Sequence, residues 1–542
     1  MASEIDWFTI AGSGVSYLAV LIIGGVAAKM TVQRGSSSES PADSVMVGHR
    51  SFGWFISICT ITATWIGSTA TIGGAERVFT NGIVSGAILG LGFSFSLFFG
   101  GLLVADKLRS KKYVSFTQLF HDKYGKFIGC FFTIPVYTSE QLCVTGALVA
   151  LGSTLSIMAN IDNTIAIVVS SLVAIVYTFF GGIFAVAYTD IVQLVFIGVG
   201  LTTAIPFVLS NNEIQLNSTE TLDQSLTKDA LNITGVLEEI DSLLPLVFGG
   251  IAYQCYMQRL LAAKTTSIAK YGSMMSCVLC ALFSSIPLVI GATARNIDWN
   301  QTMHGAIEEA SDVLPLTIKY LCPHWVTFLG LGALSAAGMS SADSCMLAAA
   351  SVFVTNIYKG LIRPRASDRE MMWAIRCAIL FVGLIGCLIA IAARSVYLTI
   401  IIASDIAYIV IFPQLICILY FSKTNSYGAI VGYLAAIVLR FGGGEPLLNL
   451  PCFIPYPGNH LDEQGQLVNV FPIKTFAMAV DFFITLALSY LTHAMHRKGI
   501  FSPRYDFAKC FQNSTKLEQN AHLKNSTPSE SENVENRKHL LS

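Results

Sequence analysis

The stretch TITATWIGSTATIGG, residues 60–74, says most about how this chain folds. It lies inside a long apolar segment, yet small and hydroxyl residues crowd its middle. Glycine permits irregular backbone, and a helix interrupted in mid-membrane exposes carbonyl oxygens that can bind a cation. Small residues also let membrane helices pack closely. Taken alone, the stretch therefore fits either a broken helix or tight helix packing.

A second interrupted segment follows five spans later. Gly249-Gly250 stands in the middle of the apolar segment 241–263 and is followed by Tyr253-Gln254. Transporters built from inverted repeats carry broken helices at corresponding positions of the two repeats. The spacing therefore favours a membrane transporter with a five-plus-five inverted repeat.

The composition is that of a polytopic membrane protein. Of 542 residues, 53% are hydrophobic and 12% are charged, whereas soluble domains carry about 25% charged residues. A span needs about 20 apolar residues, and in lipid it must be a helix because its backbone groups need internal partners. The chain is thus expected to be all-α with about thirteen transmembrane helices, at 7–30, 50–79, 82–106, 127–157, 162–181, 186–210, 241–263, 268–294, 323–358, 371–393, 396–421, 427–441 and 474–495.

Basic residues predict the orientation of these spans. The loops at 107–112, 264–270 and 359–369 carry lysines and arginines and lie on one side if all thirteen spans are correct. Short basic loops mark the cytoplasmic side. The N-terminus is then extracellular, the C-terminus is cytoplasmic, and we expect a multi-pass protein of the plasma membrane.

Glycosylation triplets agree with this orientation. Asn-X-Ser/Thr begins at Asn217, Asn232 and Asn300, all in loops assigned to the outside, where glycosylation is possible. Cys322 and Cys452 also fall in outside loops and could pair, although the sequence does not show that they do. The expected organisation is 1–49, an N-terminal span and cytoplasmic loop; 50–210, the first inverted repeat; 211–240, a glycosylated extracellular loop; 241–421, the second repeat; 422–497, the C-terminal spans; and 498–542, a polar cytoplasmic tail.

Several classes of function find no support. The net charge is −1, without the basic field that a nucleic-acid partner would require. No constellation typical of an enzyme stands out, no organic cofactor is indicated, and no phosphate loop suggests ATP hydrolysis. An ion gradient is therefore the expected driving force.

The ninth span carries AGMSSADS at residues 337–344. Hard cations prefer oxygen ligands, and the Ser340 and Ser341 hydroxyls with a carbonyl one turn earlier would supply three. The hydroxyls could equally bond back to their own helix.

Ionisable residues inside spans are costly and usually functional. Asp190 and Glu76 lie near span ends, where either could reach water. Glu140, Asp343 and Asp405 lie deeper, and we single them out as coupling residues, with a structural hydrogen bond as the alternative for each.

Two further motifs resemble a known family. GGIFAVAYTDIVQ at 181–193 and QRLLAAK at 258–264 resemble the signature of the sodium:solute symporters. Within that family the likeness is greatest to the high-affinity choline transporters, from about Val47 to Tyr490. It is carried by residues 62–65, 298–302, 320–323, 339–344, 408–414 and 443–446.

The resemblance implies a LeuT-like inverted-repeat fold with thirteen spans, sodium coupling and, for the choline branch, chloride dependence. It also implies a sodium site made of carbonyls from the broken second span and of a carbonyl and hydroxyls from the ninth. On this chain those positions are Ala63, Ile66, Ala337, Ser340 and Ser341.

The resemblance further implies an aromatic substrate site. A quaternary ammonium group donates no hydrogen bond and is held by aromatic faces. The corresponding positions hold Trp65, Tyr253 and Cys143. Cys143 departs from the family pattern, because an aromatic residue is expected there.

The leading hypothesis is sodium-coupled, chloride-dependent, high-affinity choline uptake. Its partners would be choline or a related cation, sodium and the bilayer; no nucleic acid is expected, and a homo-oligomer stays open. One alternative keeps the machinery and changes the solute. Another is a transport-inactive membrane sensor or a channel.

Overall fold

The computed structural model describes residues 22, 41–210, 233–299, 305–445, 450–458, 460–461, 467–468 and 471–498. The predicted first span, apart from residue 22, lies outside the described residues. So do Asn217, Asn232 and Asn300, and the tail after residue 498.

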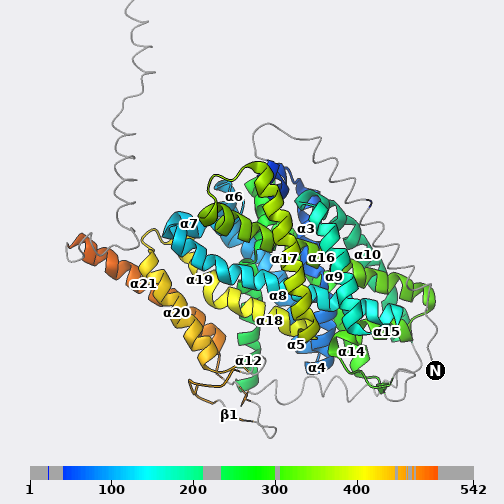
Figure 1. Cartoon of the computed structure of the whole chain (residues 1–542). Helices are drawn as coiled ribbons and strands as arrows, with labels where there is room; N and C mark the ends of the chain where they lie inside the picture. Colours follow the sequence, from blue (N-terminus) through cyan, green and yellow to red (C-terminus); the bar gives the residue numbers. More distant parts are fainter. Residues whose placement is uncertain are drawn as a thin grey trace, which may run out of the picture.

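Long apolar helices form most of the described part (Figure 1). Nine stretches there are long and apolar enough to cross a membrane. They are α5 (Ile83–Gly100) continuing through η3 (Gly101–Ala105) and α6 (Asp106–Ser110), α8 (Lys126–Ala159), α9 (Asn163–Phe180), α10 (Ile183–Leu209), α14 (Thr266–Arg295), α16 (His324–Val352) with η7 (Phe353–Ile362), α17 (Asp368–Ala393), α18 (Val396–Ile406) with η8 (Ala407–Ile411) and α19 (Phe412–Tyr420), and α21 (Ile473–Arg497).

The remaining predicted spans from residue 50 onward are broken or short. α3 (Trp54–Ile66) is followed by the π-helical turn η2 (Thr69–Gly73) and α4 (Gly74–Asn81), with a bend of 46°. α12 (Ile233–Leu244) and η4 (Pro245–Gly249) are separated from α13 (Gln254–Ala262) by residues 250–253, and α20 (Ser426–Gly442) has 17 residues.

Short elements connect the long helices. α2 (Pro41–Val47), η1 (Gly48–Arg50), α7 (Gln118–Tyr124), η6 (Ala310–Asp312) and α15 (Val313–Leu321) are helical. The two-residue strands β1 (His460–Leu461) and β2 (Leu467–Val468) pair antiparallel, with His460 opposite Val468.

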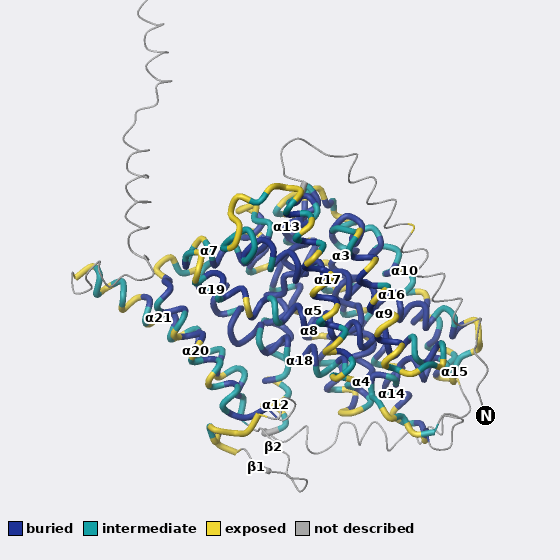
Figure 2. The backbone as a smooth tube through the Cα atoms, viewed as in Figure 1, coloured by how far each residue is buried: buried dark blue, intermediate teal, exposed yellow. Residues whose placement is uncertain are grey.

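α16 is the centre of the bundle. It packs against α8, α10 and α3, and Figure 2 shows it deep within the buried interior. Every residue from Gly330 to Val352 is buried, as expected for a helix without a polar face in the middle of a large helical protein. α20 and α21 pack against each other at one side of the bundle (Figure 1).

The outward faces of the bundle expose large apolar side chains. Leu172, Val278, Leu388 and Phe483 are all more than 60% exposed. An apolar surface spread over many helices suits hydrocarbon, whereas a soluble monomer rarely exposes large patches of this kind. The fold is that of a multi-pass membrane protein, as the composition predicted.

Two adjacent glycines let the second break pack tightly. A Cβ atom on Gly249 would lie 2.5 Å from the Ser404 carbonyl oxygen of α18, and one on Gly250 would lie 2.8 Å from Ser96 Cβ of α5. Tyr253 then takes an extended conformation, with ψ 134°. The break is thus enclosed by α5 and α18.

We predict that Gly249→Ala destabilises the protein. The added methyl group meets backbone, which moves less readily than a side chain, and overpacking of this kind costs about 1–3 kcal/mol. Thermal unfolding of the purified protein in detergent should show a lower apparent Tm. Gly53→Ala is the matched control because its Cβ would meet nothing within 4 Å; equal Tm shifts for the two variants would contradict the packing argument.

Candidate functional site

The first break meets α16 directly. α3 ends at Ile66, and Gly67 has φ −46° and ψ −149°, outside the helical region. The Ser68 N–H donates to Ser341 Oγ across 3.1 Å. A Cβ on Gly67 would lie 1.7 Å from Ser341 Oγ and 3.1 Å from the Ala337 carbonyl oxygen. Only glycine allows this contact between the broken backbone and α16.

The structure therefore brings the five predicted cation ligands into one region. Ala63 and Ile66 lie in the last turn of α3, and the other three lie on the facing turns of α16. All five are buried. Ser340 donates its hydroxyl proton to Asp190 Oδ1 at 2.6 Å, which leaves its oxygen lone pairs for another contact.

A buried ion pair lies beside this region. Asp190 of α10 is fully buried and pairs with Arg259 of α13 at 3.2 Å. Asp190 also accepts from Thr60 of α3, and Arg259 donates to Ser344 Oγ of α16 at 2.6 Å. The interpretation that Asp190 could reach water near a span end was wrong, because four helices enclose it.

Glu76 is also not a solvent-reaching side chain. Its carboxylate accepts from the Val396 and Tyr397 N–H groups, at 3.2 and 3.1 Å, and from the Ser395 hydroxyl. These groups begin α18, where a negative charge is stabilised by the helix dipole. These hydrogen bonds connect α4 to α18, and the sequence alone did not predict them.

Two of the three predicted coupling carboxylates lie near the site. Glu140 of α8 is fully buried and accepts from the Cys255 N–H at 3.0 Å. Asp343 of α16 is fully buried beside Ser344, whose hydroxyl lies 3.3 Å from Asp343 Oδ1.

Asp405 belongs to a different network. It pairs with Arg440 at 2.7 Å and with Lys474 at 3.1 Å, and Arg440 also pairs with Glu445 at 2.6 Å. This network joins α18 to the C-terminal helices and does not line the cavity described next.

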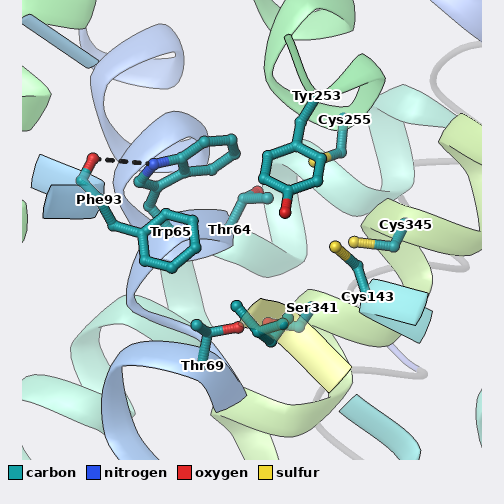
Figure 3. Close-up of a pocket in the computed structure, with 10 residues that line it drawn as sticks. Thr64, Trp65, Thr69, Phe93, Cys143, Tyr253, Cys255, Ser341 and Cys345 are labelled. Carbon is teal, nitrogen blue, oxygen red and sulfur yellow. Dashed lines mark hydrogen bonds between the residues drawn. The ribbon is translucent and has the colours of Figure 1, made fainter. Parts of the chain in front are cut away.

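Trp65 forms one wall of a cavity between the two breaks (Figure 3). Its indole N–H donates to the Phe93 carbonyl at 3.0 Å and to Ser96 Oγ at 2.9 Å. Tyr253 forms another wall, and its hydroxyl lies 3.0 Å from Ser404 Oγ. The two ring centroids are 6.2 Å apart, with the rings inclined at 75°. Hydrogen bonds thus hold both predicted aromatic residues in place.

Cys143 lines the same cavity, so the structure gathers all three predicted substrate residues there. The cavity has a volume of about 30 Å³, and one water needs about 10–15 Å³ on the same scale. An organic solute would have to part the walls. The other lining residues are Thr64, Thr69, Phe93, Cys255, Ser341, Cys345 and Ile400.

Sequence reasoning missed two aromatic residues. Phe93 packs edge-on against Trp65 at 6.2 Å, and Tyr256 lies 5.4 Å from it. Tyr256 follows Tyr253 by three residues, and this second tyrosine next to the break could have revealed it. Phe93 stands in a uniformly apolar run, which offers no comparable signal.

Cys322 and Cys452 do not pair in the described structure. Both are free, and their sulfur atoms lie near different carbonyls, of Ala204 at 3.9 Å and of Ile454 at 3.3 Å.

A buried cavity where two broken helices meet a continuous one defines a class of protein, the ion-coupled secondary transporters. Comparison with known proteins agrees. The model of the sodium:solute symporter family matches residues 46–436. The chain belongs to the sodium:solute symporter family, so the resemblance in its motifs is confirmed and it is a transporter rather than an enzyme.

Individual relatives cover most of the chain. The human high affinity choline transporter 1 is 38% identical over 91% of this chain and 86% of its own length. The Drosophila melanogaster high-affinity choline transporter 1 is 37% identical over 92% and 80%. The Haemophilus influenzae sodium/proline symporter is 26% identical over 74% and 82%.

A solved structure supports the fold. A Na⁺-coupled sialic acid symporter, in a substrate-bound outward-open state, superimposes with a TM-score of 0.72 at 16% identity. The match covers 90% of this chain and 98% of that one. The architecture is thus shared with a sodium symporter.

We predict that Asp190→Asn strongly destabilises the protein. Removing one partner of a buried ion pair leaves Arg259 charged and uncompensated, at a cost of about 3–5 kcal/mol. Asp106→Asn, which breaks the exposed pair with Lys270, should change stability little because water screens such pairs. Apparent Tm in detergent and the amount of folded protein check both variants. Equal apparent Tm values for Asp190→Asn and Asp106→Asn would contradict the conclusion that breaking the buried ion pair is costly.

Proposed function

We propose that this chain mediates sodium-coupled choline uptake across the plasma membrane. The observation that carries the proposal is the cavity between the two breaks, with Trp65 and Tyr253 held as its walls. The extensive similarity to choline transporters from human and fly supports it.

The cavity offers what a trimethylammonium group needs. Such a group is attracted by the faces of aromatic rings, with about 0.5–2 kcal/mol from each good contact. Phe93 lines the cavity and packs on Trp65, and this extra ring would offset the missing aromatic at Cys143. Binding would require Trp65 and Tyr253 to move apart, because the present cavity admits only a few waters.

Sodium would bind where the first break meets α16. Carbonyls of Ala63 and Ile66 would join the Ala337 carbonyl and the Ser340 and Ser341 hydroxyls, in keeping with the oxygen preference of hard cations. The negative charge of Asp190, bonded to Ser340, would favour a cation there. One charge moved through 100 mV supplies about 2.3 kcal/mol.

The carboxylates would have different tasks. Glu140 and Asp343 lie next to the candidate binding region and would couple sodium to the movement of α13 and α16. Asp405 would instead hold α18 to the C-terminal helices through Arg440 and Lys474.

The topology completes the proposal. Thirteen spans would place the N-terminus outside and the C-terminus in the cytoplasm, with a LeuT-like pair of repeats at 50–210 and 241–421. The loop 211–240 would be extracellular and glycosylated, and uptake would depend on chloride.

Trp65→Ala should raise the KM for choline roughly two- to thirtyfold, because 1.4 kcal/mol is about tenfold and the lost contact is worth about 0.5–2 kcal/mol. Radiolabelled uptake in expressing cells, with sodium and then chloride replaced, measures this. Trp54→Ala is the control on the same helix, since Trp54 is 46% exposed and lies away from the cavity.

The same assay separates the alternatives. Sodium currents evoked by another solute, with no response to choline, would overturn choline as the substrate and would point to the changed wall at Cys143. Solute-independent currents far above carrier turnover would indicate a channel. No solute-dependent sodium flux in a broad screen would favour a sensor.

Ser341→Ala should raise the sodium concentration for half-maximal uptake about ten- to hundredfold, since bonds to charged groups contribute about 1.5–3 kcal/mol and 1.4 kcal/mol is about tenfold. Ser335→Ala on the same helix is the matched control, because Ser335 is buried and contacts only the Met158 sulfur through its hydroxyl among the described residues. An unchanged sodium dependence in Ser341→Ala would remove this residue from the proposed site.

A further inference from the structure

Three thiols line the cavity, and a buried carboxylate lies beside two of them. Glu140 and Cys143 lie one turn apart on α8, Cys255 lies in the first turn of α13, and Cys345 lies on α16. All four are at least nine-tenths buried. Figure 3 shows the Cys143 and Cys345 sulfur atoms facing each other below Tyr253.

The separations suit a metal ion. One oxygen of Glu140 and the sulfur atoms of Cys255 and Cys345 all lie within 4.8 Å of one another. With Zn–S bonds of about 2.3 Å, the sulfur atoms of a tetrahedral site lie about 3.8 Å apart. A shift of about 1 Å would therefore close the site. Cys143 lies outside this set of three but lines the same cavity beside Cys345 (Figure 3), where its thiol can move in to supply a fourth ligand.

The carboxylate gives a second, independent indication. Glu140 Oε1 accepts from the Cys255 N–H, but Glu140 Oε2 has no hydrogen-bond partner among the described residues although the side chain is fully buried. A buried acceptor without a partner is costly. A cation between the carboxylate and the thiols would remove that cost.

We propose that Glu140, Cys143, Cys255 and Cys345 bind one soft divalent cation of the Zn²⁺ class. Thiolates select such ions over sodium, which prefers oxygen. The alternative is that the cysteines are small packing residues, which does not account for the unpartnered carboxylate oxygen among them.

The metal ion can reach the site through the cavity, and once bound it would affect transport. Cys143, Cys255 and Cys345 all line the cavity, so the ion reaches them by the route that opens for the solute. Once bound, it joins α13, which follows the second break, to α8 and α16. Such a link opposes relative movement of these helices and blocks transport; this last step rests on the proposed function, whereas binding of the ion does not.

Cd²⁺ tests the binding directly, because its bonds to thiolates absorb in the ultraviolet. The reduced, purified full chain is titrated with Cd²⁺ alone. We expect a thiolate-to-metal band that saturates at one equivalent. Cys345→Ala and Glu140→Gln should each weaken binding roughly tenfold or more, since even outer-shell changes cost about 10–100-fold. Cys280→Ala, another fully buried thiol outside the cluster, should leave the titration unchanged.

Three results would overturn the site. One is a wild-type protein that shows no such band. Another is a band that Cys345→Ala, Cys255→Ala and Glu140→Gln all leave intact, with folding of each variant checked by its elution as a monodisperse peak. A disulfide found between Cys143 and Cys345 in the active protein would also overturn it, because the thiols would then be consumed.

Uptake supplies a separate measurement. Micromolar Cd²⁺ should inhibit sodium-dependent uptake by the wild-type protein, and Cys255→Ala should relieve the inhibition at least tenfold. A saturable Cd²⁺–thiolate band in a protein that takes up no choline would contradict the proposed substrate and support the metal site. Choline uptake by a protein that shows no such band would support the proposed substrate and contradict the metal site.

Discussion

The fold depends on two breaks in membrane helices that can exist only because they are buried. In hydrocarbon every backbone polar group needs a partner within the protein. At the first break the Ser68 N–H finds Ser341 Oγ, and Gly67 leaves room for that approach. At the second break Gly249 and Gly250 let α18 and α5 approach the backbone closely. α16, α18 and α5 thus surround the irregular backbone and shield it from the hydrocarbon.

The buried charges organise the helices around these breaks. Arg259 and Asp190 join α13 to α10, and their hydroxyl partners on α3 and α16 complete the set. A pair of this kind adds little net stability against a hydrophobic replacement but is costly to break. It therefore specifies one arrangement of four helices, and that arrangement holds the candidate cation ligands beside the solute cavity.

Cation and solute chemistry share the same small space. Ser341 lies at the first break and also lines the cavity, while Cys345 lies one turn further along α16 on the thiol wall. Movement of α16 relative to the breaks would alter both regions at once. This proximity is the physical basis for coupling one to the other, and it explains why a metal ion on the thiol wall would interfere with transport.

Much of this protein could be predicted from its sequence. Apolar length specified the membrane helices, because hydrocarbon admits little else, and the glycine-rich stretch at 60–74 with Gly249-Gly250 marked both breaks. Family motifs located Trp65, Tyr253 and the residues on α16. Only the tertiary structure placed Asp190 and Glu76 inside the protein, because their partners lie on helices remote in sequence. Packing likewise decided that Phe93 lines the cavity and that Glu140, Cys255 and Cys345 lie close together. The residue pattern along one helix does not show which side chains from three different helices meet.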